Sequence, residues 1–432
     1  MNYDLILRSH RTLLPEGERP ADVGIRDGLI AAVAGHQALT GHDVIDLGEC
    51  ALLPGLVDTH VHVNEPGRTQ WEGFDTATRA AAAGGVTTIV DMPLNSIPPT
   101  VDTEALRVKR AAAAEQCYVD VGFWGGAVPG NAGALPALHE RGVFGFKAFL
   151  IDSGVPEFPP LDPAGLEEAL GAVDALFVVH AEDPALVTAA HGEHFADFVA
   201  SRPPQAEARA VAAAIEAARR TGARVHILHL AAADALPLIA AARREGVRVT
   251  AETCPHYLTL DAADVPDGAT QYKCCPPIRD RSHQDALWQA LADGVVDCVV
   301  SDHSPCPPDL KAGDFGSAWG GIASVQLGLP LIWTAAAARG HTLADVVRWM
   351  AANPADLVGL PGKGRIAEGA DADLVAFDAD AGFTVDAAKL LHRHHVSPYH
   401  GRRLRGVVRD TWLRGRLAGA EPMGRLLERG RA

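Results

Sequence analysis

The sequence predicts an α/β protein: a (β/α)8 barrel of the TIM type with a small β-sandwich module formed by both ends of the chain. Three observations carry this prediction. Eight apolar segments alternate with helical segments between about residues 52 and 302, short alternating segments stand at both ends, and the first strand ends in His-x-His. Strand–helix alternation over such a length is typical of a parallel barrel.

The predicted barrel strands are apolar runs bounded by polar loops, at 52–62, 87–92, 119–124, 143–150, 176–180, 224–230, 247–252 and 296–302. Helical stretches, several of them rich in alanine, are predicted between them at 74–83, 103–116, 166–173, 207–220, 234–245 and 285–292. A doubly wound open sheet is the alternative, but that fold has a glycine-rich phosphate loop after its first strand. Here the first strand leads into His60-Val61-His62, which favours the barrel.

The two ends of the chain are predicted to meet in one β module. Residues 3–12 and 23–33 alternate in polarity and are broken by proline and glycine, as hairpins are, and residues 372–377 and 404–413 have the same character. We therefore expect residues 1–52 and 363–432 to form the module and its tail. The barrel, residues 53–362, is inserted between them.

The composition argues against nucleic-acid and membrane partners. The 432 residues are 48% hydrophobic and carry a formal net charge of −16, which opposes binding to a phosphate backbone. No apolar run reaches membrane-spanning length and Met1-Asn2-Tyr3-Asp4 lacks the features of a signal peptide, so a cytoplasmic location is expected. The seven scattered cysteines are expected to be small buried residues rather than a disulfide framework.

The first barrel strand is predicted to open into a metal site. His60 and His62 are two residues apart and therefore share a face of the strand, together with Asp58. Two neutral imidazoles converging at a strand end suit a divalent cation of the zinc type. Taken alone, the pair is equally compatible with two histidines satisfied in a core.

The ends of the other strands supply further groups of the same chemistry. Barrel enzymes place their chemistry at the C-terminal strand ends. We therefore expect four more residues to converge on this spot: Lys147, His180, His229 and Asp302. His226 stands three residues before His229, and this odd offset points it to the opposite face, where a satisfied histidine is expected.

The remaining histidines are expected to have supporting or structural roles. His256 and His303 are candidates for residues that contact the metal ligands rather than the metal. The histidines at 191, 194 and 392–400 are expected to be structural or at the surface.

Lys147 lies inside an apolar strand, where a charged lysine is costly to bury, so its pKa should fall. A neutral amine can react with CO₂ to give a carbamate, which is a carboxylate on a long arm and can bridge two cations. The alternative is a lysine that pairs with an acid or reaches the surface. The histidines and the aspartate at neighbouring strand ends favour the carbamate.

Together these segments resemble a known family. The chain is similar to the cyclic amidohydrolases of the amidohydrolase superfamily, the group of dihydroorotases, hydantoinases and allantoinases. The similarity is specific because five strands must agree at once. It is carried by residues 53–65, Lys147, His180, His229 and residues 253–256, 302–305 and 362–377.

The resemblance implies a binuclear metal site. His60 and His62 would hold one cation, His180 and His229 the other, and a carboxylated Lys147 and a water or hydroxide would bridge them. Asp302 would ligate a metal and shuttle the proton. The implied cofactors are two divalent ions, first of all Zn²⁺, with Co²⁺, Mn²⁺ and Fe²⁺ also compatible with these ligands, and a CO₂-derived carbamate on Lys147.

Within the family, the sequence favours allantoin as substrate. Dihydroorotases typically carry an arginine where Asn64 stands. An asparagine lacks the two parallel N–H donors with which an arginine binds a substrate carboxylate. Residues 91–100, 145–158, 273–279 and 319–322 are similar to allantoinases. The resemblance therefore implies hydrolysis of allantoin, a neutral ureide, to allantoate. The residues expected to orient the ring are Asn64, Ser153, Cys275, Trp319 and Gly320.

In the expected mechanism, hydroxide attacks a ring carbonyl, and Asp302 passes the water's proton to the departing ring nitrogen. A hydantoinase, a dihydropyrimidinase or a dihydroorotase acting on a related cyclic amide remains the alternative. Lys147 disfavours a mononuclear deaminase, and the complete ligand set disfavours a scaffold homologue without activity. Allantoinases are often homotetramers, so a homo-oligomer, specifically a tetramer, is expected.

Overall fold

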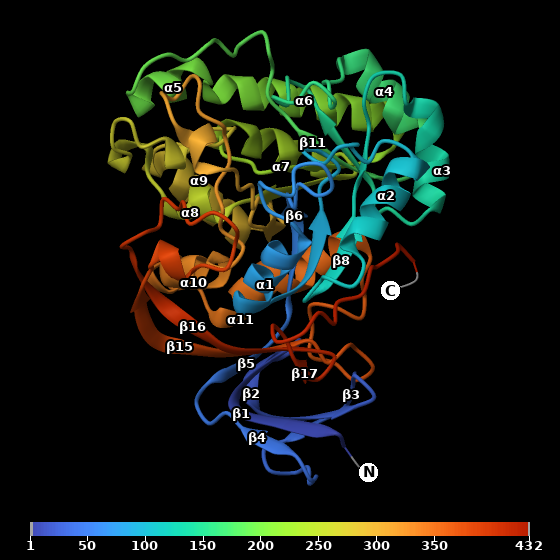
Figure 1. The fold of residues 1–432 in the computed structure, drawn as a ribbon, viewed down its shortest axis with the longest axis vertical. Helices are drawn as coiled ribbons and strands as arrows, with labels where there is room; N and C mark the ends of the chain where they lie inside the picture. The colour runs from blue at the N-terminus through green and yellow to red at the C-terminus, as the bar shows by residue number, and fades with distance from the viewer. Residues whose placement is uncertain (1–2, 431–432) are drawn as a thin grey trace.

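The computed structural model describes residues 3–430. Residues 1–2 and 431–432, the outermost residues of the two predicted terminal parts, lie outside the described residues. In Figure 1 a helix-covered barrel stands above a β module, in which blue N-terminal strands lie beside red C-terminal strands.

Within residues 3–430, eight parallel segments form the barrel in chain order, as predicted. They are β6 (Leu56–Val61), β7 (Val86–Asp91), β8 (Asp120–Phe123) with its continuation β9 (Gly125–Gly126), β10 (Phe146–Phe149), β11 (Leu176–His180), β12 (Arg224–Ile227), β13 (Val249–Thr253) and β14 (Cys298–Val299). A parallel bridge between Val61 and His303 closes the barrel. Across this seam, the backbone N–H of His62 donates to the carbonyl of His303 at 2.8 Å.

Helices lie between the barrel strands, close to the predicted ranges. Their bounds are α1 (Phe74–Ala83), α2 (Thr103–Ala113), α3 (Leu135–Glu140), α4 (Pro163–Ala172), α5 (Phe195–Ser201), α6 (Pro204–Thr221), α7 (Leu236–Arg244), α8 (Pro255–Thr259) and α9 (Arg281–Ala292). After β14 come α10 (Gly328–Ala338), α11 (Leu343–Val347) and α12 (Asn353–Val358). No helix within residues 3–430 has both the length and the apolar character needed to cross a bilayer.

The two ends of the chain meet in one sheet, as predicted. Its strand order is β17-β16-β15-β5-β1-β2-β3, with β4 paired to β1. The strands are β1 (Leu5–Leu14), β2 (Gly17–Arg26), β3 (Leu29–Gly35), β4 (Val44–Asp46), β5 (Ala51–Pro54), β15 (Leu374–Thr384), β16 (Arg403–Leu413) and β17 (Arg416–Leu417). Side chains from both ends, among them Leu7, Val23, Leu374 and Trp412, form an apolar core of the module's own.

The predicted strand 52–62 is divided in the structure. Residues Leu53 and Pro54 pair with β15 of the module, two residues beyond the expected limit at 52, and the barrel strand begins at Leu56. Gly55 makes this change of sheet possible, because a Cβ at this position would lie 2.1 Å from Oγ1 of Thr87. Only glycine allows so close an approach of the backbone to a neighbouring side chain.

The barrel and the module are joined by a buried network of charges. Nζ of Lys363 lies 2.6 Å from a carboxylate oxygen of Asp120 at the start of β8, and 2.7 Å from one of Asp371 and one of Asp373 next to the module. Arg414 of the module also binds Asp120, at 2.7 Å. Buried charges of this kind are tolerated only when they are paired.

We predict that Lys363→Met lowers the free energy of unfolding by about 3 kcal/mol, because it leaves the buried carboxylate of Asp373 without a partner cation, whereas Asp120 keeps Arg414. Urea unfolding followed by fluorescence measures the change. Lys389→Met is the control, since the Lys389 side chain is 84% exposed and its removal should change the midpoint very little. Equal midpoints for the two variants would contradict a stabilising role of the network.

Candidate metal centre and active site

All six residues predicted as metal ligands line one cavity of about 450 Å³ at the carboxyl ends of the strands. His60 lies within β6 and His62 directly follows it, Lys147 lies within β10, and His180 is the last residue of β11. His229 and Asp302 follow β12 and β14 by two and three residues. The strand order of a parallel barrel therefore brings together groups that are far apart in the sequence.

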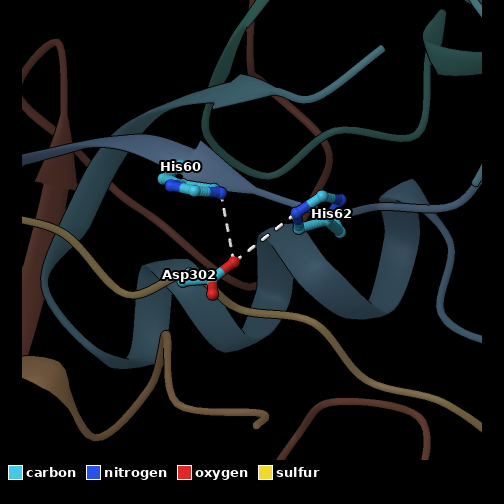
Figure 2. A group of neighbouring side chains, drawn as sticks. All are labelled: His60, His62 and Asp302. Carbon is cyan, nitrogen blue, oxygen red and sulfur yellow. Dashed lines mark ion pairs between the residues drawn. The ribbon is translucent and has the colours of Figure 1, made fainter. Parts of the chain in front are cut away.

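His60, His62 and Asp302 lie close together in the cavity (Figure 2). Oδ1 of Asp302 lies 3.1 Å from Nε2 of His60 and 3.5 Å from Nε2 of His62. One ligand atom from each residue lies within 4.8 Å of the others. Two imidazoles and a carboxylate at this spacing are a suitable ligand set for a divalent cation.

His229 connects this group to His180 on the neighbouring strands. Its ring centroid lies 5.3 Å from that of His60 and 4.5 Å from that of His180. The backbone of His229 has φ 37° and that of Asp302 has φ 43°, the left-handed region that residues other than glycine rarely adopt. Such strained backbone clusters at functional sites, where the surrounding fold holds it in place.

Lys147 is buried in the same cavity, and burial lowers its pKa to about 8, although Asp302 and Glu252 oppose the shift. The predicted fall of this pKa therefore agrees with the structure. At neutral pH, a lysine with a lowered pKa has a larger fraction of neutral, reactive amine than a lysine at the surface.

Two buried glutamates bind ring nitrogens of His60 and His180. Glu252 binds Nδ1 of His60 at 2.6 Å and Nε2 of His226 at 3.0 Å. Glu182 binds Nε2 of His180 at 2.8 Å and is itself bound by Arg202 at 2.7 Å. Carboxylates in this position fix the orientation of a ligating imidazole and raise its basicity. His226 is thus a satisfied histidine, as its offset from His229 predicted.

The charges around His60 favour an additional positive charge. Burial alone would lower the pKa of His60, but Asp302 and Glu252 raise it to about 9. His62 lacks a second carboxylate, and burial lowers its pKa to about 4. Burial also lowers the pKa of His229 well below its ordinary value. The site therefore combines neutral imidazoles with carboxylates, the combination that a cation requires.

Unpaired nitrogen atoms provide a test of whether these residues fit a metal. Nε2 of His60 and Nδ1 of His229 are buried, and neither has a hydrogen-bond partner of good geometry within residues 3–430, although Oδ1 of Asp302 lies 3.1 Å from Nε2 of His60. Buried polar atoms are normally satisfied, so nitrogen atoms left without a partner in one cavity point to a missing ligand. A divalent cation would satisfy them, and the residues therefore fit the metal.

Three other groups of possible ligands lie in the described part of the chain. Asp120, Asp371 and Asp373 already bind Lys363, and His226, Glu252 and Cys298 lie behind His60. Cys254 and His256 approach Asp302, and both ring nitrogens of His256 lack a partner among residues 3–430. His256 therefore lies where a supporting residue was predicted. All seven cysteines are free thiols.

Four of the five residues expected to orient the substrate line the cavity: Ser153, Cys275, Trp319 and Gly320. Asn64 does not line it, and this prediction is corrected. Its backbone turns to φ 67° beyond the end of β6, its side chain is fully buried, and Nδ2 donates to the carbonyl of Pro305 at 3.3 Å. Asn64 was predicted from its position in the family motif, but it lies three residues beyond β6, which ends at Val61.

Several polar residues that line the cavity were not predicted as site residues, among them Asn95, Arg202 and Lys273. Asn95 follows the end of β7 and has φ 63°, so its position after a barrel strand was a signal that could have found it. Arg202 lies in the short connection between α5 and α6, and Lys273 follows a short 3-10 helix at Thr270–Tyr272, so neither of them stands at the end of a barrel strand.

A parallel barrel that gathers histidines, a lysine and an aspartate at the carboxyl ends of its strands defines a metal-dependent barrel hydrolase. Comparisons with known proteins agree. The model of the Amidohydrolase family matches residues 51–418. The chain therefore belongs to the amidohydrolase family.

Individual relatives support this assignment. The chain is 58% identical to the allantoinase of Streptomyces avermitilis over 99% of both chains. It is 49% identical to the allantoinase of Saccharomyces cerevisiae, over 87% of this chain and 84% of that one. Among solved structures, the L-hydantoinase (dihydropyrimidinase) from Arthrobacter aurescens superposes with a TM-score of 0.91 at 31% identity, covering 99% of this chain and 98% of that one.

We predict that Glu252→Gln weakens the binding of Zn²⁺ by about 10- to 100-fold, because it removes the carboxylate that orients His60. Competition with a chromogenic chelator measures the affinity without reference to activity. Thr250→Val is the control, since the hydroxyl of Thr250 binds His226 at 2.7 Å and contacts none of the predicted metal ligands within residues 3–430. Equal affinities of the two variants would contradict the role given to Glu252.

Proposed function

We propose that the protein hydrolyses the cyclic amide bond of allantoin to give allantoate, a step of purine and ureide catabolism. The observation that carries the proposal is the set of six cation-binding side chains around one cavity, in a chain that groups with the allantoinases. Hydantoinases have the same architecture. Hydrolysis of another cyclic amide is therefore the second candidate.

Two divalent cations, first of all Zn²⁺, are proposed as the cofactors. His60 and His62 would hold one cation and His180 and His229 the other, with Asp302 as a further ligand. We propose that Lys147 carries a carbamate, since its side chain lines the same cavity as both pairs of histidines. When bound, the cations would supply a hydroxide at neutral pH and polarise the scissile carbonyl.

Asp302 is proposed to move the proton. Contacts with His60, His62 and His229 keep its pKa well below the ordinary value against the effect of burial, so the carboxylate is ionised and can accept a proton. Its position in the cavity wall allows it to take the proton of the attacking water and deliver it to the ring nitrogen. One group then serves first as general base and afterwards as general acid.

The opposite wall of the cavity is proposed to orient the ring. Ser153, Cys275, Trp319 and Gly320 line it, and the indole of Trp319 is supported by Trp71, whose ring centroid lies 5.0 Å away. Asn95 adds a carboxamide, which can donate to a carbonyl and accept from an N–H of a neutral ureide.

We further propose that the protein acts in the cytoplasm as a homo-oligomer, with a tetramer as the specific form. The support is the resemblance to allantoinases and the composition of the sequence. The proposed substrate is a small molecule, and no nucleic acid or membrane takes part.

We predict that zinc-loaded protein hydrolyses racemic allantoin at least about 100 times faster than hydantoin, dihydrouracil or dihydroorotate, because a site that hydrogen-bonds a substrate group discriminates strongly against analogues that lack it. Release of the ring-opened products measures each rate. Activity on hydantoin or dihydrouracil without activity on allantoin would agree with hydrolysis of a cyclic amide at this site but would reject allantoin as the substrate.

We predict that Asp302→Asn lowers kcat by about 1,000-fold or more, since proton transfer by a positioned group contributes about 10²- to 10⁴-fold. Turnover of allantoin and zinc content by atomic absorption are measured on the same sample. The variant should retain a large part of the metal, which distinguishes a lost proton shuttle from a lost site. Turnover like that of the wild type would reject this role of Asp302.

We predict that Lys147→Met lowers the zinc content from two ions to one or fewer per chain, because no side chain is left to carry the bridging carboxylate. Metal analysis after dialysis measures this content. Lys109→Met is a matched control, since Lys109 is also fully buried in the barrel but binds Asp91, at 2.6 Å. Two firmly bound ions in Lys147→Met would reject the bridge.

A further inference from the structure

One wall of the cavity consists of an irregular segment, residues 316–321, which we call the 316–321 wall. All six residues of this wall line the cavity. The segment belongs to no helix or strand. Its shape therefore depends on contacts other than the regular hydrogen bonds of secondary structure.

Two lysines bind the wall through its backbone carbonyls. Nζ of Lys273 donates to the carbonyls of Gly316 at 3.1 Å and Ala318 at 2.5 Å. Nζ of Lys311 donates to the carbonyls of Trp319 at 2.8 Å and Gly321 at 2.6 Å. Four of the six carbonyls of the wall thus accept from an ammonium group. Hydrogen bonds from a charged donor are about twice as strong as those between neutral groups.

The backbone N–H groups of the wall are bound as well. Oδ1 of Asp314 accepts from the N–H groups of Gly316 and Ser317. The N–H of Trp319 donates to the carbonyl of Leu310 at 2.7 Å, and that of Gly321 donates to the carbonyl of Lys273 at 2.8 Å. These contacts leave the N–H of Gly320 as a backbone donor that can face a ligand.

Lys311 has no donor left for a substrate. An ammonium group has three protons, and its third neighbour is the carbonyl of Lys273, at 3.5 Å from Nζ. Lys311 also does not line the cavity. Burial lowers its pKa to about 8, which still leaves it mostly protonated at neutral pH. Its contacts therefore serve the wall and not a ligand.

We propose that Lys311, together with Lys273, is a positioning residue that fixes the 316–321 wall and thereby sets the affinity for the substrate. The inference rests on the proposed function, which makes this wall part of the substrate site. The wall is also held at its outer end, where Phe315 packs between Phe195 and Phe198 with ring centroids 5.1 Å and 6.0 Å away. Loss of the lysine contacts should therefore loosen the residues of the wall that line the cavity.

The test compares Lys311→Met with the wild-type enzyme loaded with zinc. We expect the KM for allantoin to rise by about tenfold or more, with kcat within about threefold and the zinc content unchanged, because the change removes binding and leaves the reacting groups in place. Amide exchange followed by mass spectrometry should be faster in peptides that cover 316–321. Lys273→Met should show the same pattern, and it provides the test if Lys311→Met does not fold.

Lys363→Met is the matched control. Lys363 is another buried lysine that binds several acceptors, but its partners are Asp120, Asp371 and Asp373 at the junction with the module. This variant should lose stability while its KM and the exchange of 316–321 stay at the wild-type values.

The possible failures can be told apart. An unchanged KM and unchanged exchange in both lysine variants would overturn the proposal, and so would a fall in kcat at constant KM. If the wild-type enzyme does not hydrolyse allantoin, the proposed substrate is rejected, and the exchange measurement still decides whether the lysines fix the wall.

Discussion

Closure of the barrel between its first and last strands is the constraint on which the site depends. The N–H of His62 donates to the carbonyl of His303, and the carboxylate of Asp58 accepts from the N–H of Ser301 at 3.1 Å. These bonds tie the end of β6 to the loop after β14. As a consequence, Asp302 comes to lie beside His60 and His62, although more than 200 residues separate them in the sequence.

Closure of the barrel buries negative charges beside His60, and a bound cation would neutralise them. Carboxylates of Asp302 and Glu252 flank His60, and Nδ1 of His229 in the same cavity lacks a hydrogen-bond partner among residues 3–430. The two carboxylates raise the pKa of His60, whereas burial lowers that of His62. Glutamates behind His60 and His180 complete the arrangement, because they fix the imidazole orientation.

The backbone conformation at the site is held by the same framework. Positive φ values at His229 and Asp302 cost free energy that the surrounding fold must offset. Hydrogen bonds from Lys273 and Lys311 hold the opposite wall. One side of the cavity is thus fixed by strands and the other by buried ammonium groups, which suits a small, rigid ring as ligand.

Much of the fold and of the candidate site could be predicted from the sequence, because a parallel barrel converts strand-end positions into neighbours. This rule correctly predicted that Lys147, His180 and Asp302 lie in one cavity. The prediction for Asn64 rested on its position in the family motif instead, and there the backbone turns to φ 67° and the side chain is fully buried.

Contacts that depend on tertiary structure could not be predicted. Glu252 lies within a strand, and no sequence pattern connects it to His60, 192 residues away. Gly55 gave no visible sign of the change of sheet, which follows from its contact with Thr87. Lys273 and Lys311 act through backbone carbonyls, which carry no sequence signal at all.

The most direct measurement is an anomalous difference map of crystals grown with zinc. We expect two peaks in the cavity, one beside His60, His62 and Asp302 and one beside His180 and His229, with density for a carboxyl group on Nζ of Lys147. A single peak, or zinc bound at Cys254 and His256 instead, would contradict a binuclear centre built by closure of the barrel.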